Sequence, residues 1–313
     1  MSWNLPGESR YGIHSIDHFA LEVPSLAQAR HFFEAFGLDV SEEGAGLALR
    51  THAGPHVWAR LHHGPKKRLA YLSLSCFDDE YEALCTQALA AGAKAAPQGT
   101  SYLSAEGRWF FDLDGNLVQL KAGPKMTPFA MTHSTVHQAG PNERGMRNRS
   151  AVRQVHPRRL SHVLMFTPDI DRALKFWSDA FGLRLSDRGG EVVAFMHGRH
   201  GSDHHLLAFA ASSARGWHHS AWDVDGVDEV GHGGEQMRAA GYTEGWGTGH
   251  HVLGSNFFHY VRDPWGSFAE YSADIDFIPM GAKWLSASHP AEDSLYQWGP
   301  PLPEYFIHNV EAD

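Results

Sequence analysis

The sequence has few cysteines and no long apolar run, and both features narrow the class of protein. Its 313 residues include two cysteines, Cys76 and Cys85, too few for a disulfide framework. No stretch reaches the roughly 20 apolar residues that a membrane-spanning helix needs. The first residues also lack the basic and apolar pattern of a secretory leader. We therefore expect a protein of the reducing cytoplasm with no membrane partner.

The sequence also has fewer basic than acidic residues. Lysine and arginine total 26 against 36 acidic residues, which gives a net charge of -10 and argues against a nucleic-acid partner. Histidine, by contrast, is abundant, with 23 residues, so metal or acid–base chemistry is worth testing. The length leaves room for about two domains.

The same pattern of residues occurs twice along the chain. Each copy opens with a strand-like segment, a proline and a helix-like segment that ends in Gly-Leu, and each closes with a similar turn and strand. These segments are residues 16–38 and 160–183 at the two openings, and residues 111–120 and 262–271 at the two ends. His162 thereby answers to His18. An internal duplication with a mixed-sheet α+β architecture follows from this pattern.

The duplication also predicts where the domains lie. We expect a first domain at residues 13–123, a second at 159–275, a linker at 124–158 and a tail at 276–313. The arginine-rich linker is typical of a solvated segment or an interface. The tail is rich in proline and aromatic residues, and we expect it to wrap over the second domain.

A carboxylate near the end of the second copy marks a candidate site. Glu270 lies between Ala269 and Tyr271 in an apolar strand, directly after a turn at residues 263–266 that Pro and Gly favour. Burial of a carboxylate there is costly unless the group is paired or binds a metal.

Comparison of the two copies tests this candidate. Where the second copy has Glu270, the first has Gln119. Alignment of the serines in an earlier pair of strands places Leu72 opposite His219. Only the first histidine of the set persists in the first copy, as His18. The first copy has therefore lost two of three candidate metal ligands.

The second copy keeps the whole set, namely His162, one histidine of the pair His218–His219, and Glu270. Because side chains alternate across a strand, we expect His218 and His219 to face opposite ways, and periodicity does not choose between them. Two imidazoles and one carboxylate suit divalent iron, manganese or zinc. With open positions on the metal, this set suggests non-haem iron and oxygen chemistry.

Three motifs of the second copy carry a resemblance to a known family. Residues 204–209 read His-His-Leu-Leu-Ala-Phe, and residues 218–219 are a second His pair. A closing signature runs from His251 through Tyr260 and the Asp-Pro-x-Gly turn to Glu270. Together they resemble the type I extradiol ring-cleaving dioxygenases of the vicinal-oxygen-chelate superfamily, a resemblance that covers about residues 13–275.

The resemblance implies a fold, a metal and partners. The fold would be two tandem vicinal-oxygen-chelate domains, each a pair of βαβββ modules that form a mixed-sheet open barrel. His162, His219 and Glu270 would bind Fe(II), with Mn(II) as the alternative metal. The substrates would be a small catecholic molecule and O2, and homo-oligomers are common in the family.

It also implies roles for the remaining site residues. His205 would be the acid–base residue of the pocket, with His204 facing away on the other side of its strand. His251 and Tyr260 would hydrogen-bond the hydroxyl oxygens of the substrate. His259 stands where the family usually has an aliphatic residue or Phe, and we expect it to be structural.

Two other functions remain as alternatives. One is a glyoxalase-like or other metalloenzyme on the same fold, which has less use for a His, His and Tyr set beside the metal. The other is a non-enzymatic protein that binds aromatic ligands, against which the retained ligand set argues. The sequence leaves open whether the diol is monocyclic, bicyclic or carboxylated.

Overall fold

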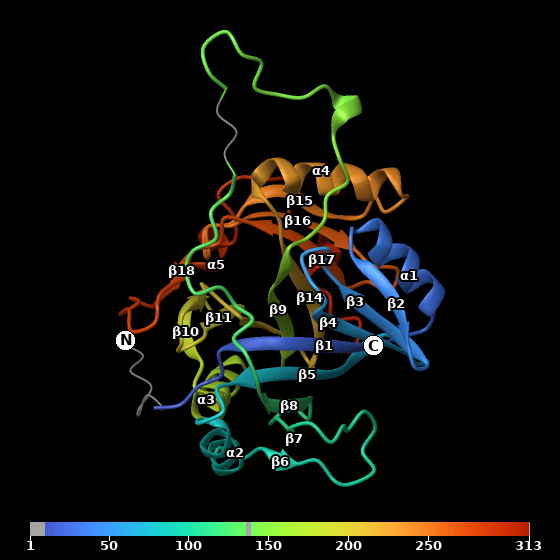
Figure 1. The fold of residues 1–313 in the computed structure, drawn as a ribbon. Helices are drawn as coiled ribbons and strands as arrows, with labels where there is room; N and C mark the ends of the chain where they lie inside the picture. Colours follow the sequence, from blue (N-terminus) through green and yellow to red (C-terminus); the bar gives the residue numbers. More distant parts are fainter. Residues whose placement is uncertain (1–9, 136–138, 313) are drawn as a thin grey trace.

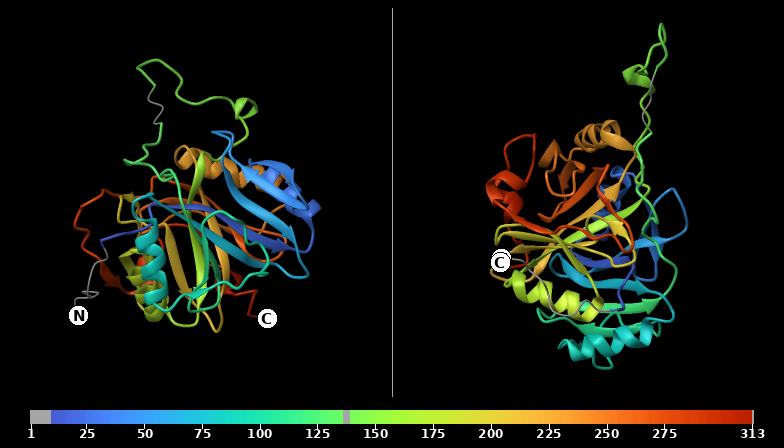
Figure 2. Two further views of the ribbon diagram at one scale, coloured as in Figure 1. Left: turned by 60° about the horizontal axis from the view of Figure 1, so that its bottom comes forward. Right: turned by 90° about the vertical axis from the view of Figure 1, so that its left-hand side faces the viewer.

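A computed structural model describes residues 10–135 and 139–312 of the chain. Two large mixed sheets make up its body, and they lie against each other through a continuous hydrophobic core (Figures 1 and 2). Phe19 of the first sheet and Trp217 of the second meet at this contact, with ring centroids 4.7 Å apart. No helix in the described part of the chain is long and apolar enough to span a bilayer.

The first sheet consists of two βαβββ modules. Its elements are β1 (Ser15–Val23), α1 (Leu26–Ala35), β2 (Asp39–Glu43), β3 (Gly46–Arg50), β4 (Val57–His63), β5 (Arg68–Cys76), α2 (Tyr81–Ala90), β6 (Lys94–Ala95), β7 (Arg108–Phe111) and β8 (Leu117–Ala122). The strand order β2-β3-β4-β1-β5-β8-β7-β6 places the opening strands of the two modules side by side. β1 runs antiparallel to β5 and parallel to β4, the last strand of its own module.

The second sheet repeats this plan. Its elements are β9 (Arg159–Thr167), α3 (Ile170–Phe181), β10 (Arg184–Gly189), β11 (Val193–His197), β13 (Leu207–Ala211), β14 (Gly216–Asp223), α4 (Gly226–Ala239), β15 (Gly245–His250), β16 (Phe257–Arg262), β17 (Phe268–Ala273) and β19 (Ala287–His289). The order is β15-β16-β17-β14-β9-β13-β11-β10-β19. The predicted α+β fold with paired βαβββ modules is therefore confirmed.

Short elements complete the chain. These are β12 (Ser202–Asp203) paired with β18 (Phe277–Ile278), the 3-10 turns η1 (Arg149–Ala151) and η2 (Glu304–Ile307), and α5 (Ala291–Ser294). Residues 139–153 of the linker extend away from both sheets, whereas the tail adds β19 to the second sheet (Figure 1). The exact domain limits stay a prediction.

Local sequence signals explain where the first helix of each sheet begins. The Ser25 hydroxyl accepts a hydrogen bond from the Gln28 N–H at 3.3 Å, and the Asp169 carboxylate accepts one from the Arg172 N–H at 2.9 Å. Such a cap contributes about 1 kcal/mol. α3 ends at Gly182, whose φ of +66° favours glycine.

The strand ladders correct one alignment of the two copies. In the structure, His18 pairs with Ser73 and His162 pairs with Ala221. Two positions before these partners lie Tyr71 in the first copy and His219 in the second. The prediction that Leu72 is the counterpart of His219 is therefore wrong. The aligned serines occupy different positions in the two strand ladders, so an alignment based on them shifts the second copy by one residue. The Tyr71 hydroxyl lies 3.0 Å from His18 Nε2, so the first copy pairs these groups directly.

Candidate metal centre and substrate cavity

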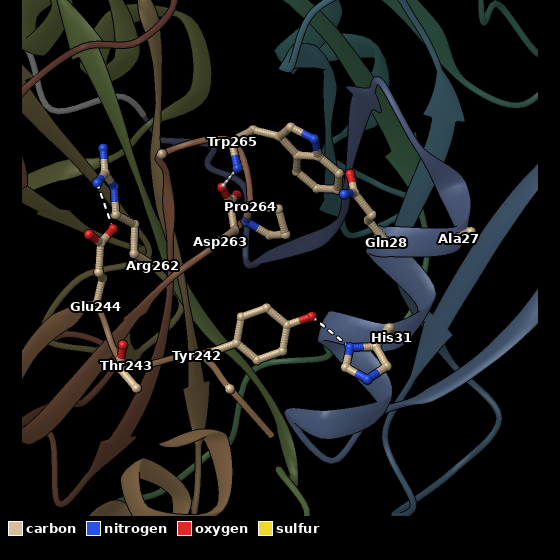
Figure 3. A pocket seen from close by; sticks show the side chains of 12 residues that line it. Ala27, Gln28, His31, Tyr242, Thr243, Glu244, Arg262, Asp263, Pro264 and Trp265 are labelled. Atoms are coloured by element: carbon tan, nitrogen blue, oxygen red, sulfur yellow. Dashed lines mark hydrogen bonds and ion pairs between the residues drawn. The ribbon is translucent and has the colours of Figure 1, made fainter. Parts of the chain in front are cut away.

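A large cavity lies between the two sheets but away from the predicted site (Figure 3). It has a volume of about 970 Å³ and is lined by α1, by the loop that precedes β15 and by the turn that follows β16. Its titratable side chains pair with one another. The Tyr242 hydroxyl is 2.8 Å from His31 Nδ1, and Arg262 donates to Glu244 at 2.7 Å. None of the predicted site residues lines this cavity.

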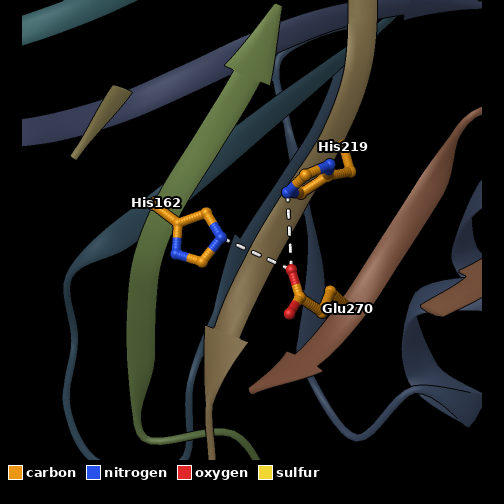
Figure 4. Close-up of side chains that lie close together, drawn as sticks. All are labelled: His162, His219 and Glu270. Atoms are coloured by element: carbon orange, nitrogen blue, oxygen red, sulfur yellow. Dashed lines mark ion pairs between the residues drawn. The ribbon is translucent and has the colours of Figure 1, made fainter. Parts of the chain in front are cut away.

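Three adjacent strands of the second sheet bring the predicted metal ligands together (Figure 4). His162 comes from β9, His219 from β14 and Glu270 from β17, and one donor atom of each lies within 4.8 Å of the others. Glu270 Oε2 is 3.4 Å from the Nε2 atom of each histidine. All three side chains are buried, and Glu270 has no exposed surface.

The atoms that face one another fit a divalent cation. His219 Nε2 and Glu270 Oε2 are buried and have no hydrogen-bond partner among the described residues, which is costly for polar atoms. The opposite atoms are held in place, because Asn256 donates to Glu270 Oε1 at 3.0 Å and Ser161 Oγ lies 3.2 Å from His162 Nδ1. Outer contacts of this kind orient metal ligands, and two imidazoles with one carboxylate leave open positions on the metal.

A bulge in β14 decides between the two adjacent histidines. The ladder with β9 shifts register between Trp217 and His219 and leaves His218 as the extra residue. His218 and His219 therefore do not face opposite ways, and that expectation is wrong. Their Nδ1 atoms are 2.6 Å apart, and His218 Nε2 donates to the carbonyl of Phe306 at 2.7 Å. His218 thus supports His219, whose pKa burial holds well below its usual value, as a neutral ligand requires.

His205 lies beside the candidate metal ligands. Its ring centroid is 4.0 Å from that of His162, and burial holds the pKa of His205 well below its usual value. His204 does not face away, because its Nδ1 atom is 3.0 Å from His205 Nδ1. That expectation is wrong because both residues precede β13 rather than lying within a strand, so the alternation of side chains does not apply.

His251 and Tyr260 face each other in the same cavity. His251 Nδ1 donates to the carbonyl of Leu295 at 2.7 Å, and its Nε2 lies 3.0 Å from the Tyr260 hydroxyl. His250 turns away and binds the Ser255 carbonyl at 2.9 Å, so His251 is the residue that faces the site. Burial raises the pKa of Tyr260 well above its usual value, and the phenol therefore keeps its proton.

His259 lies outside the cavity, on the face of β16 that packs against α4. Its Nδ1 is 3.1 Å from the Thr248 hydroxyl. A Cβ atom at Gly234 would lie 2.4 Å from the His259 ring, so the helix approaches this ring as closely as a glycine allows. A structural role, as the sequence predicts, agrees with this packing.

The candidate site opens into a mostly apolar cavity of about 480 Å³. Histidines, Asn256 and Tyr260 line the end near the candidate ligands, and the rest is lined by aliphatic and aromatic side chains together with Glu292 and Ser294. The apolar lining comprises Leu164, Phe166, Val192, Val193, Phe195, Ala210, Ala211, Leu253, Leu295, Tyr296, Leu302, Phe306 and Ile307. The C-terminal tail supplies one wall. The lining residues, all within the described part of the chain, include no lysine or arginine.

Sequence reasoning missed two residues that contact the site. Asn256 holds Glu270, and the one available signal was a lone amide among the apolar residues before β16. Asp187 accepts a hydrogen bond from His204 at 3.0 Å, although the two residues are 17 positions apart. No spacing rule connects an aspartate in β10 with a histidine near β13.

Known proteins resemble this chain over nearly its whole length. The family model of the Glyoxalase/Bleomycin resistance protein/Dioxygenase superfamily matches residues 159–271. Metapyrocatechase 2 from Cupriavidus necator is 56% identical over 303 residues, which cover 97% of this chain and 94% of that protein.

Solved structures share the fold at low sequence identity. A homoprotocatechuate 2,3-dioxygenase from Brevibacterium fuscum gives a TM-score of 0.75 at 20% identity and covers 97% of this chain and 84% of that chain. An Mn(II)-bound glyoxalase from Novosphingobium aromaticivorans gives 0.73 at 22% identity and covers 97% and 100%. The 56% identity to a metapyrocatechase over 97% of the chain shows that this chain belongs to the extradiol dioxygenases of the glyoxalase, bleomycin resistance protein and dioxygenase superfamily.

Proposed function

We propose that this protein cleaves the ring of a catecholic diol beside its two hydroxyl groups, with O2 as the second substrate and Fe(II) as its metal. One observation carries the proposal. His162, His219 and Glu270 bring one donor atom each within 4.8 Å of the others, and those of His219 and Glu270 are buried without a hydrogen-bond partner among the described residues. They lie at one end of a mostly apolar cavity that His205, His251 and Tyr260 also line. Family membership supports the same reaction.

His162, His219 and Glu270 would hold the metal. Two imidazoles, one carboxylate and open positions favour iron, with Mn(II) as the alternative. A bound metal ion acts as a Lewis acid toward the diol and brings both reactants together. The two neutral histidines and the anionic glutamate leave one positive charge of a divalent ion uncompensated, which favours an ionised diol.

His251 and Tyr260 would bind the hydroxyl oxygens of the diol. The Tyr260 phenol stays protonated, so it donates a hydrogen bond and also offers an aromatic wall to the ring. His251 is fixed by its bond to the Leu295 carbonyl, which leaves Nε2 as an acceptor for the Tyr260 hydroxyl, 3.0 Å away, or for a hydroxyl of the diol. His205 would accept and return a proton at Nε2 during the reaction.

The lining of the cavity selects among diols. A volume of about 480 Å³ exceeds the need of a single ring, and the walls beyond the histidines are mostly apolar, with Glu292 and Ser294 as the polar exceptions. A carboxylated diol would meet no lysine or arginine among the lining residues, and burial of its charge would be costly. We therefore propose a catechol with an apolar substituent as the preferred substrate.

Oxygen uptake with a panel of diols tests the function. Anaerobically purified protein should hold about one iron per chain and consume O2 with catechol and with alkyl- or aryl-substituted catechols, giving a yellow ring-opened product. Protocatechuate should be a poor substrate. The proposal would be refuted if iron-replete protein consumed no O2 with any diol.

We also propose a cytoplasmic homo-oligomer. The sequence supports the compartment through its two reduced, buried cysteines, and the resemblance supports the assembly. Light scattering after size-exclusion chromatography would measure the molar mass, and a mass near 34.7 kDa would contradict the assembly.

A further inference from the structure

Behind His205 lie two buried side chains, Asp187 and His204, that the reaction as described above does not use. Asp187 Oδ2 is 3.0 Å from His204 Nε2, and His204 Nδ1 is 3.0 Å from His205 Nδ1. Exposed fractions are 6% for Asp187, 1% for His204 and 4% for His205, so water does not compete for these bonds.

The C-terminal tail fixes Asp187, the residue of this hydrogen-bonded series that lies farthest from the cavity. β19 pairs with β10 so that Ala287 lies opposite Asp187. The backbone N–H of Ala287 donates to Asp187 Oδ1 at 2.9 Å, and the indole N–H of Trp284 donates to Oδ2 at 3.1 Å. His289 Nε2 lies 3.2 Å from Oδ1. Backbone and indole N–H groups can only donate, so Asp187 acts as an acceptor toward both.

The donors that contact Asp187 then determine where the protons lie on His204 and His205. Although burial opposes it, the bonds from His204 and from the Ala287 N–H hold the pKa of Asp187 below its usual range. An ionised Asp187 accepts only, so His204 Nε2 must carry a proton. In a neutral imidazole the other nitrogen is then an acceptor, so His204 Nδ1 receives the Nδ1 proton of His205. The remaining nitrogen of His205, Nε2, keeps its lone pair for the cavity.

We propose that Asp187 and His204 are positioning residues that fix the tautomer and the ring orientation of His205. The inference rests on the proposed function in one respect, that His205 exchanges a proton with the diol and oxygen species. With Nε2 bare, His205 can take a proton from the diol first and return it later. The reverse tautomer would present an N–H to the diol and could not accept its proton.

An isosteric substitution tests this directly. Asp187→Asn leaves one acceptor oxygen for the donors of His204, Trp284 and Ala287. With the amide N–H toward His204, His204 Nε2 becomes the acceptor and the tautomers of both histidines reverse. We expect kcat to fall by about 10²- to 10⁴-fold, the range of general acid–base catalysis. Iron content and the anaerobic dissociation constant of the diol should stay within about twofold of wild type.

Matched variants separate positioning from general damage. Asp171→Asn makes the same charge change on a half-exposed aspartate that pairs with Arg188 and does not touch His204, and it should leave kcat unchanged. His204→Asn keeps an acceptor near the Nδ1 position and should retain more activity than His204→Phe. In a His205→Ala background, Asp187→Asn should cause no further loss of kcat, because coupled residues are not additive.

A spectroscopic measurement gives a readout independent of turnover. In full-length protein loaded with diamagnetic Zn²⁺ and labelled with 15N at histidine, His205 should show a protonated Nδ1 and a bare Nε2, and Asp187→Asn should reverse them. A protonated Nε2 in wild type, or a kcat of Asp187→Asn equal to wild type, would overturn the inference. If wild type consumed no O2 with any diol while the tautomer was as expected, the proposed function would fail and the positioning would stand.

Discussion

Replacement of Glu270 by glutamine should have opposite effects on the metal-free and the metal-bound protein. Glu270 has no exposed surface, and within the described part of the chain its Oε2 atom has no hydrogen-bond partner. An unsatisfied buried polar group costs about 1–3 kcal/mol, and more when it is charged. Glu270→Gln keeps the Oε1 acceptor for Asn256 and adds an N–H that can donate to either imidazole, 3.4 Å away. We therefore expect unfolding of the metal-free variant to require about 1–3 kcal/mol more than wild type.

The first copy shows that a glutamine is satisfied at the equivalent position. Gln119 accepts from the Ser73 hydroxyl at 2.7 Å and donates to the carbonyl of Glu106 at 2.8 Å. For the metal-bound protein we expect the opposite change in the free energy of unfolding: the variant should be less stable than wild type, because a charged ligand is lost. Changes in outer contacts alone lower metal affinity about 10- to 100-fold, so we expect Glu270→Gln to lower Fe(II) affinity by at least about 100-fold.

Urea unfolding under anaerobic conditions, with Fe(II) or with a chelator, measures both effects. Glu244→Gln is the matched control, since Glu244 forms an exposed ion pair with Arg262 that contributes about 0–1 kcal/mol. If Glu270→Gln destabilised the protein equally with and without iron, Glu270 would be a structural partner of the two histidines rather than a ligand. Full iron retention by the variant would refute the ligand assignment as well.

Three further outcomes are expected. His205→Ala should retain iron and bind diol anaerobically but lose about 10²- to 10⁴-fold in kcat, and unchanged turnover would make His205 structural. Ala210→Phe narrows the apolar wall, so kcat/KM should fall more for an aryl catechol than for catechol, and equal losses would contradict the proposed substrate class. Burial lowers the pKa of His218 to about 4 and of His197 to about 3, so the unfolded chain binds more protons below about pH 6.5. Stability should fall as the pH drops from 6.5 toward 4, by about 1.4 kcal/mol per pH unit for each histidine, and a flat urea midpoint over that range would contradict this.

Much of the fold could be predicted because its signals are local. Caps such as Ser25 and Asp169, the turn at residues 263–266 and the repeated strand-helix pattern depend on neighbouring residues, and the structure contains each of them. The pairing of copies was harder, because ladder register depends on residues far away in sequence. Tyr71 rather than Leu72 answers to His219 for that reason.

Within the candidate site, residue types were easier to predict than their orientation. A lone glutamate in an apolar strand is costly without a partner, so Glu270 could be singled out from the sequence. The directions of the two His pairs could not, because a bulge at His218 and a turn at His204 break the alternation of side chains. The bulge arises in the ladder of β14 with β9, and His204 lies between β12 and β13 rather than within a strand. They place His218 behind His219 and His204 behind His205, an arrangement that strict alternation excludes.

The two copies differ in whether the polar atoms at the equivalent position have hydrogen-bond partners. In the first sheet, His18 contacts the Tyr71 hydroxyl at 3.0 Å, and the Arg60 guanidinium lies 2.7 Å from His18 Nε2. A cation placed there would be repelled by Arg60 and would have to displace existing hydrogen bonds. In the second sheet the corresponding atoms of His219 and Glu270 have no hydrogen-bond partner in residues 10–135 and 139–312, so we expect that copy to be less stable when metal-free. We expect these unsatisfied atoms to favour a cation at that site only, which is why the expected stoichiometry is one metal ion per chain.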